Sequence, residues 1–250
     1  MSGRMQAMRT LIVADVHSNL DAFQAVIDDA ASNGGFDEIW SLGDILGYGP
    51  EPSECIELLR SYPHKMVAGN HDLGSVGEVS LRRFNPYAAA ANRWTAEQLT
   101  PEQADYIRAL PLTLEIGEFT LAHGSPRDPI WEYLTTAEAA IACFTHIETY
   151  WCLVGHSHLP FLCIPRLDSA AFMELPEDRR VQLDDNPLII NPGSVGQPRD
   201  RDPRASFVVY DNADNTILHR RVPYDIEATQ EKMRRHNLPD FLIDRLAVGH

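Results

Sequence analysis

Five short polar motifs each follow an apolar run in this chain, and together they contain almost every strong candidate for a metal ligand. The motifs are Asp15-Val16-His17, Gly43-Asp44, Gly69-Asn70-His71-Asp72, His123-Gly124 and Gly155-His156-Ser157-His158. Their imidazole, carboxylate and amide groups are ligand types that transition metals accept. The apolar runs before them, residues 10–14, 38–42, 65–68, 119–122 and 150–154, are predicted strands. Because an α/β sheet places its chemistry at the carboxyl ends of its strands, the five motifs predict one polar site.

The first two motifs carry little information when each is taken alone. Asp15 and His17 stand two residues apart, which on a strand would place both side chains on one face. Such a triplet is nevertheless common by chance. A pair such as Gly43-Asp44 usually forms a turn or caps a helix. Both motifs gain weight from their position after successive strands of an alternating series.

The third motif contains three groups that could act together. Gly69 permits a tight turn after the strand, and Asn70 can offer a neutral oxygen to a metal. His71 can donate or accept a proton near neutral pH, and Asp72 could hold its imidazole in one tautomer. The alternative is an ordinary turn rich in Asn and Asp.

The last two motifs add three imidazoles. His156 and His158 are two residues apart at a strand end, so each can reach one of two adjacent ions, and His123 comes from a neighbouring strand. A lone histidine is more often structural than a ligand, but histidines at matching strand ends favour a metal site. Surface or packing positions are predicted for His64, His146, His219, His236 and His250.

The segments between the motifs predict helices that return the chain from one strand to the next. Residues 19–31 carry apolar side chains at helical spacing, and Ser53 is expected to cap a helix that continues to Leu59. This alternation predicts parallel strands joined by right-handed crossovers, with helices on both faces.

Residues 85–110 predict two further helices. Asn85 and Pro86 fit an N-cap and a first helical position, and Thr100 pairs with Gln103 in a capping box. Packing against the sheet is the ordinary role of such helices, and a lid over the site is the alternative.

The second half of the chain is richer in predicted strands. The pair Gly117-Glu118 predicts a hairpin turn between strands at 112–116 and 119–122. Further strands are predicted at 161–164, 170–175, 188–190, 206–210 and 216–222, with a helix over 226–246.

The composition is that of one globular domain in a reducing compartment. The 250 residues are 44% hydrophobic, which fits a single domain over 1–250 with residues 1–8 as a disordered lead-in. Neither a signal peptide nor a membrane span is predicted. The four cysteines, Cys55, Cys143, Cys152 and Cys163, form no C-x-x-C pair. We expect buried free thiols and a cytoplasmic location.

The net charge limits the range of partners. At −15 the chain repels extended nucleic acid, so that class of partner is not expected. A small phosphate compound can still bind if metal ions supply local positive charge. No membrane partner is expected, and the sequence does not indicate an oligomeric state.

With all five motifs present in order, the chain resembles the calcineurin-like metallophosphoesterases, whose signature is D-x-H, G-D, G-N-H-[DE], H and G-H-x-H. The segments 43–50, 85–110 and 191–199 are similar to the small prokaryotic phosphodiesterase branch of that superfamily. The resemblance implies an α/β fold, a four-layer α/β/β/α sandwich of two mixed β-sheets with flanking helices.

The resemblance also implies two divalent transition-metal ions per chain, with manganese favoured over iron or zinc. The first ion would be held by Asp15, His17, Asp44 and His158, and the second by Asp44, Asn70, His123 and His156. His71 would act as general acid or transition-state stabiliser, oriented by Asp72. Asn70, His71, Tyr48 and Arg199 are candidates for substrate contact, with packing or a surface salt bridge as the alternative for Tyr48 and Arg199.

The activity that this resemblance implies is hydrolysis of a small phosphodiester or nucleotide by attack of a metal-bridging hydroxide on phosphorus. Phosphoprotein phosphatases of the superfamily carry arginines in their extended G-D and G-N-H motifs. Here Ile45-Leu46-Gly47 follows Asp44 and Ala68 precedes Gly69, so phosphoprotein substrates are disfavoured. The alternatives are a diadenosine polyphosphate hydrolase and a non-catalytic metal-binding scaffold, as in the retromer-subunit relatives. The presence of His71 and of every ligand disfavours the scaffold.

Overall fold

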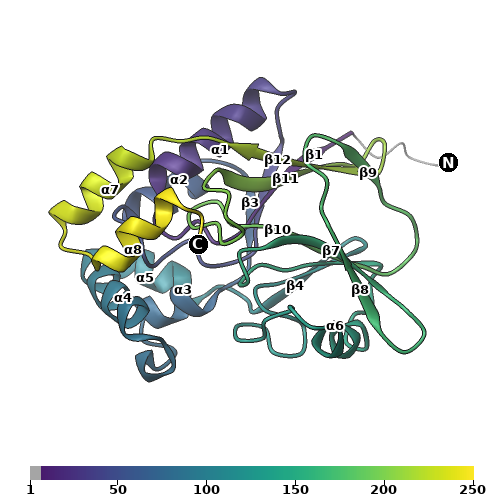
Figure 1. Ribbon diagram of the computed structural model, residues 1–250, viewed down its shortest axis with the longest axis horizontal. Helices are drawn as coiled ribbons and strands as arrows, with labels where there is room; N and C mark the ends of the chain where they lie inside the picture. Colours follow the sequence, from purple (N-terminus) through teal and green to yellow (C-terminus); the bar gives the residue numbers. More distant parts are fainter. Residues whose placement is uncertain (1–6) are drawn as a thin grey trace.

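Two six-stranded mixed β-sheets face each other in the computed structural model, which describes residues 7–250 (Figure 1). The first sheet contains, in order, β3 (His64–Met66), β2 (Glu38–Ser41), β1 (Arg9–Val13), β11 (Ala205–Asp211), β12 (Thr216–Val222) and β9 (Arg180–Gln182). The second contains, in order, β4 (Thr113–Ile116), β5 (Phe119–Ala122), β6 (Trp151–Leu153), β10 (Leu188–Pro192), β7 (Pro160–Pro165) and β8 (Ala170–Met173).

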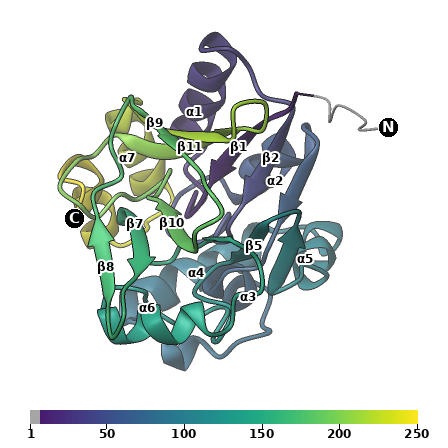
Figure 2. The ribbon, with the colours of Figure 1, turned by 90° about the vertical axis from the view of Figure 1, so that its right-hand side faces the viewer.

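Helices cover the outer faces of both sheets. The α-helices of the described residues are α1 (Leu20–Ser32), α2 (Pro52–Arg60), α3 (Asn70–Ser75), α4 (Pro86–Gln98), α5 (Pro101–Arg108), α6 (Ala137–Phe144), α7 (Ile226–Arg235) and α8 (Asp240–Asp244), with 3-10 turns at Leu81–Arg83 and Arg245–Ala247. Figure 2 shows α1 beside the first sheet and α6 beside the second, on opposite sides of the molecule.

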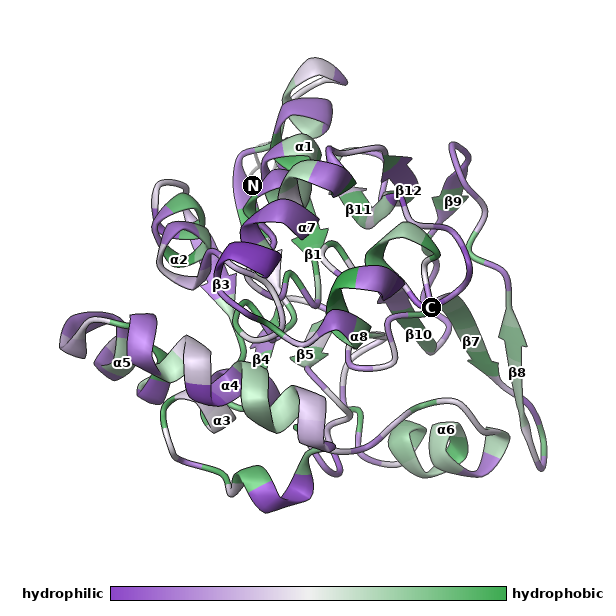
Figure 3. Cartoon of the chain, turned by 60° about the vertical axis from the view of Figure 1, so that its left-hand side comes forward, coloured by the Kyte–Doolittle hydropathy of each residue, from purple (hydrophilic) through white to green (hydrophobic). Residues whose placement is uncertain are grey.

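Alternation along single strands divides the core into layers. On β1, Leu11 packs with α1 and α2, whereas Ile12 packs between the sheets. On β6, Leu153 points between the sheets and Cys152 points toward α6. Strand side chains alternate in this way with a period of two. The strands β1, β7 and β10 are accordingly hydrophobic, while α7 is largely hydrophilic (Figure 3). The predicted four-layer α/β/β/α sandwich is confirmed.

Parallel pairing brings the polar motifs to shared edges. In the first sheet β1 pairs with β2 and β2 with β3, all parallel, so these strands end on the same side. In the second sheet β6 lies parallel to both β5 and β10. The hairpin predicted around Gly117 joins β4 and β5.

Helix starts follow the predicted caps at two of three places. The Asn85 side chain accepts a hydrogen bond from the backbone of α4, and Thr100 and Gln103 form the capping box of α5. Asn19, which was predicted to lie within the first helix, caps α1 instead. The third predicted cap is wrong. Helix α2 begins at Pro52, and the Ser53 hydroxyl instead donates to the carbonyl of Gln98 on α4.

The C-terminal helix predicted over 226–246 is also wrong in its extent. It ends at Arg235, because Asn237 takes a left-handed φ of 52° and Pro239 precedes α8. Three short elements, α3, α6 and β9, were not predicted. For the predicted lead-in, residues 1–6 lie outside the described part, while Met8 donates its backbone N–H to Asn212 Oδ1 at 2.7 Å.

Two bulk features complete the description. The four cysteines are free and buried. Within residues 7–250, no helix combines the length and the apolar character that crossing a membrane requires.

Buried His219 predicts a pH dependence of stability. Its Nδ1 lies 3.1 Å from the Leu175 carbonyl, and burial lowers the pKa of His219 to about 4. The unfolded chain binds this proton near pH 6.5, so the contribution is complete above that pH and is lost as pH falls toward 4. We expect His219→Gln to flatten the fall in unfolding free energy between pH 6.5 and 4 by up to about 1.4 kcal/mol per pH unit. Urea unfolding of both proteins across this range checks it, and identical slopes would contradict it.

Candidate metal centre

The residues at the strand ends share an unusual backbone conformation. Asp15, His17, Asp44, His156 and His158 have φ values of 54°, 51°, 55°, 64° and 60°. Residues other than glycine rarely take this left-handed conformation, although Asn, Asp and His tolerate it best. Each turn redirects the chain directly after its strand, and the side chains converge between the two sheets' edges.

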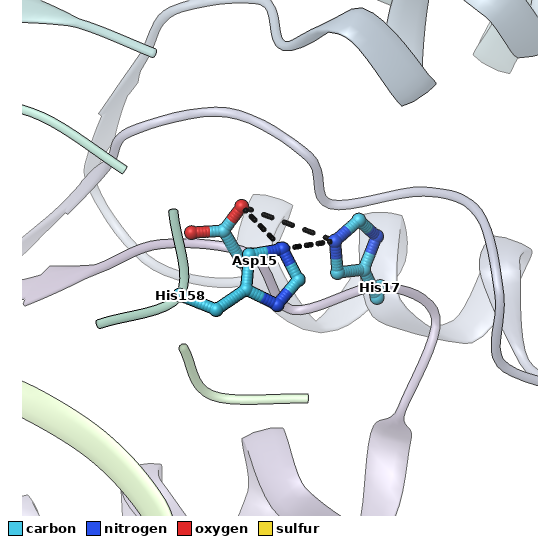
Figure 4. Close-up of side chains that lie close together, drawn as sticks. All are labelled: Asp15, His17 and His158. Atoms are coloured by element: carbon cyan, nitrogen blue, oxygen red, sulfur yellow. Dashed lines mark hydrogen bonds and ion pairs between the residues drawn. The ribbon is translucent and has the colours of Figure 1, made fainter. Parts of the chain in front are cut away.

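One group of ligand atoms is formed by Asp15, His17 and His158 (Figure 4). The two Nε2 atoms of His17 and His158 are 3.1 Å apart, and His158 Nε2 is 3.2 Å from Asp15 Oδ1. All three side chains are buried.

A second group is formed by Asp44, His123 and His156, with Asn70 beside it. The His123 Nε2 atom is 3.1 Å from His156 Nδ1, 3.1 Å from Asn70 Oδ1 and 3.2 Å from Asp44 Oδ2. These residues come from four different strand ends, in both sheets.

The Asp44 carboxylate connects the two groups. Its Oδ2 atom lies 3.2 Å from His123 Nε2 and 3.7 Å from His17 Nε2. Its other oxygen accepts the backbone N–H of His71 at 2.8 Å. The structure therefore brings together all seven predicted ligands, with Asp44 between the two sets.

Backbone carbonyls fix the tautomers of three imidazoles. The Nδ1 atoms of His17, His123 and His158 donate to the carbonyls of Leu46, Leu42 and Gln197 at 2.9, 2.9 and 2.6 Å. In a neutral imidazole the opposite nitrogen then carries a lone pair. All three Nε2 lone pairs are thus aimed into the centre, which is the arrangement a metal ligand requires.

The pKa of three imidazoles in the centre is lowered, and that of His123 is raised. Burial lowers the pKa of His17 and His158 well below the ordinary value and that of His156 to about 3. Burial acts in the same direction on His123, but the Asp44 carboxylate outweighs it and raises the pKa of His123 to about 9. A cation beside Asp44 is therefore stabilised, whether it is a proton or a metal ion.

The side chains of Asp72 and His71, which follow the turn at Gly69, contact different partners. The Asp72 carboxylate accepts the backbone N–H groups of Asp44, Leu46 and Gly69 at 2.7, 3.0 and 2.9 Å. The predicted orientation of His71 by Asp72 is not found among these contacts. Asp72 instead fixes the loop that carries Asp44.

The partner of the His71 ring is Asn92 on α4, which sequence reasoning missed. His71 Nδ1 lies 3.0 Å from Asn92 Oδ1. Burial lowers the pKa of His71, while the Asp44 carboxylate and the hydrogen bond with Asn92 oppose this shift. The only sequence indication was that Asn92 is a polar residue among alanines on a predicted helix.

Glycine is required at position 69 because Asp44 lies close to its backbone. A Cβ atom at this position would lie 2.1 Å from Asp44 Oδ1 and 2.5 Å from the Asp44 backbone nitrogen. The glycine of the third motif thus makes room for the carboxylate that both ligand groups share.

The segment that follows β10, up to residue 199, holds the ligand loops in place through hydrogen bonds to their backbone. Ser194 Oγ donates to the Asp15 carbonyl at 2.8 Å, and Asn191 Nδ2 donates to the Gly155 carbonyl at 2.8 Å. Gly196 donates its N–H to the Asp15 carbonyl at 2.9 Å, and a Cβ there would meet the Val16 carbonyl oxygen at 1.8 Å. This explains physically why the residues 191–199 accompany the ligand motifs.

Aromatic and basic side chains form the rim of the centre. The Tyr48 ring lies 4.5 Å from the His17 ring and 4.3 Å from the His71 ring, between centroids. The Arg199 guanidinium is 6.0 Å from the Tyr48 ring, so both predicted contact residues lie beside the site. Half-exposed Tyr133, which was not predicted, stacks on His156 at 3.9 Å.

Residues 8–215 match the family model of the calcineurin-like phosphoesterase superfamily domain. The chain belongs to the calcineurin-like phosphoesterase superfamily. The resemblance seen in the sequence motifs is thereby confirmed, and this is a metal-dependent hydrolase family.

Two proteins are similar to this chain over nearly their whole length. A metallophosphoesterase from Sphaerobacter thermophilus is 44% identical, with a TM-score of 0.88 over 98% of this chain and 100% of that one. An uncharacterized protein of Methanocaldococcus jannaschii is 39% identical over 95% of this chain and 97% of its own length.

More distant relatives carry the name bis(5'-nucleosyl)-tetraphosphatase, symmetrical. The one from Glaesserella parasuis is 27% identical over 62% of this chain. The alignment spans only 56% of that relative's own length.

The hydrogen bonds of Asp72 predict a structural role. We expect Asp72→Asn to lower the free energy of unfolding by on the order of 2–3 kcal/mol, because a donor replaces one of the oxygens that accept buried backbone N–H groups. Urea unfolding of the metal-free protein measures this. Asp105→Asn, whose side chain is 77% exposed on α5, is the matched control. An Asp72→Asn protein as stable as its parent but slow in turnover would return Asp72 to a role on His71.

Proposed function

We propose that this protein hydrolyses phosphodiester bonds with two divalent transition-metal ions. The first ion would be bound by Asp15, His17, Asp44 and His158, and the second by Asp44, Asn70, His123 and His156. The observation that carries this proposal is the position of Asp44 Oδ2, within 3.7 Å of His17 Nε2 and 3.2 Å of His123 Nε2. One carboxylate placed between two imidazole groups suits a bridging ligand.

The donor set supports this assignment. Neighbouring ligand atoms around one ion lie roughly 3 Å apart when the bonds are about 2.1 Å long. The spacings of 3.1 Å between His17 and His158 and between His123 and His156 match that value. Lone pairs that face each other at such distances repel unless a cation lies between them. The mixture of nitrogen and oxygen donors suits manganese, iron or zinc, and we favour manganese.

Two bound ions would supply a nucleophile at neutral pH and neutralise phosphoryl charge. The chain's own residues would exchange the proton with the leaving group and add positive charge near the substrate. His71 lies at the same centre, 4.9 Å from the His17 ring between centroids, and can exchange a proton with the leaving group. Arg199 adds positive charge at the rim, and Tyr48 packs between it and the imidazoles.

A second candidate is hydrolysis of dinucleoside tetraphosphates. It is supported by the relatives named as symmetrical bis(5'-nucleosyl)-tetraphosphatases and by the half-exposed ring of Tyr133, on which a base could stack. Because the alignment with the Glaesserella parasuis protein spans only 56% of that relative's own length, the activity in its name carries less weight, and the simpler diester stays the first candidate.

The ligand set predicts two ions per chain. Elemental analysis after manganese loading and gel filtration should return about two for the parent. We expect about one for His158→Ala and fewer than one for Asp44→Asn, because only Asp44 serves both groups. Exposed His146→Ala is the control and should match the parent. A parent protein that retains one ion or none would count strongly against the proposal.

A substrate panel tests the activity itself. We expect the manganese-loaded protein to cleave bis(p-nitrophenyl) phosphate faster than p-nitrophenyl phosphate. On methyl phenyl phosphate, whose phenol leaving group needs a proton, His71→Ala should keep its metal and lose roughly 10²-fold or more in kcat. Diadenosine tetraphosphate in the same panel separates the two candidates. A preference for the monoester would reject the diesterase assignment, and a His71→Ala protein that is fully active on methyl phenyl phosphate would reject the acid role.

A further inference from the structure

We infer that Asn92 is a positioning residue for His71, holding its ring in one tautomer through a side-chain oxygen. The inference rests on the proposed function, in which His71 exchanges a proton with the leaving group. It assigns a role to α4, a helix that contributes no ligand to either group of the candidate metal centre.

The contact between the two side chains is direct and shielded. His71 Nδ1 lies 3.0 Å from Asn92 Oδ1, with His71 only 4% exposed and Asn92 fully buried. The Ser75 hydroxyl approaches the same oxygen at 3.4 Å. A Cβ atom on Gly47 would lie 2.5 Å from His71 Nδ1 and 2.9 Å from Asn92 Oδ1, so glycine at this position leaves room for the pair.

The chemistry of the amide oxygen selects the tautomer. Because Asn92 Oδ1 can only accept, His71 Nδ1 must carry the hydrogen, and any proton exchanged with a ligand passes through Nε2. Within residues 7–250, His71 Nε2 makes no hydrogen bond and is therefore available. The rings of Tyr48 and Phe84, with centroids 4.3 and 5.0 Å away, pack against the imidazole and oppose its rotation.

The rest of the Asn92 side chain argues against a purely structural role. Its Nδ2 atom is buried and has no hydrogen-bond partner among the described residues. Buried polar groups are nearly always paired, and leaving one unpaired costs about 1–3 kcal/mol. The half of the amide that makes contacts is the half that faces His71.

Two substitutions at this position separate acceptor from packing. Asn92→Asp keeps an oxygen in place of Oδ1 but replaces the neutral amide by a buried carboxyl group, whereas Asn92→Leu keeps the branched shape at Cγ and removes the acceptor. We expect Asn92→Leu to lower kcat on methyl phenyl phosphate, whose leaving group is unsubstituted phenol, by roughly 10- to 100-fold. KM and manganese content should be unchanged. The loss should be several-fold smaller on methyl p-nitrophenyl phosphate, because p-nitrophenolate leaves without a proton. Asn92→Asp should stay within a few-fold of the parent on both.

A control variant and three possible outcomes test the inference. Glu97→Ala, on the exposed face of α4, should behave as the parent. Equal losses on both leaving groups for Asn92→Leu, or no loss, would overturn the inference. An Asn92→Asp protein as slow as Asn92→Leu would mean that an oxygen acceptor at this position does not support His71, which overturns the inference.

A spectroscopic measurement covers the case in which Asn92→Leu does not fold. The ¹⁵N shifts of the His71 ring in the zinc-loaded parent should show a hydrogen on Nδ1 and none on Nε2 in the neutral form. The opposite tautomer would reject the inference. If the parent hydrolyses no ester, the proposed function fails, while this measurement still decides how Asn92 holds the ring.

Discussion

The sharing of one buried carboxylate by two groups of imidazoles is the constraint on which the rest of this structure depends. Asp44 can lie 3.2 Å from His123 and 3.7 Å from His17 only because its loop is held by the Asp72 carboxylate and because Gly69 leaves space beside it. Burial makes this arrangement sensitive, since an uncompensated carboxylate in the interior is costly. The imidazoles and the cation that the centre favours offset that cost.

The fold satisfies this constraint by bringing two sheets to a common edge. Parallel β1, β2 and β3 supply Asp15, Asp44 and the turn at Gly69, while parallel β5 and β6 supply His123 and His156. The apolar layer between the sheets fixes their separation, and the segment after β10 ties the two sets of loops together through Ser194 and Asn191. Close packing of the sheets thereby fixes the positions of the side chains at the centre.

The sequence predicted what depends on local pattern and on motif order. The parallel strands and the cap at Asn85 were found where expected, and the side chains predicted as ligands lie together in the structure. The contact of Asn92 with His71 and the stacking of Tyr133 on His156 could not be predicted, because they join residues whose separation in space is set by tertiary packing. The same limitation explains the error at Ser53, whose hydroxyl found a partner on another helix. Asp72 was assigned to its sequence neighbour, although its carboxylate turns back to the Asp44 loop.

The left-handed backbone at Asp15, His17, Asp44, His156 and His158 has a consequence for how this protein can be altered. Such conformations store strain of order 1–3 kcal/mol each, and glycine would relieve it. Glycine would also delete a ligand at every one of these positions. Natural drift or laboratory selection toward heat resistance therefore cannot use the sites where the largest local gains lie. It must act on helix surfaces, loops and outer core layers.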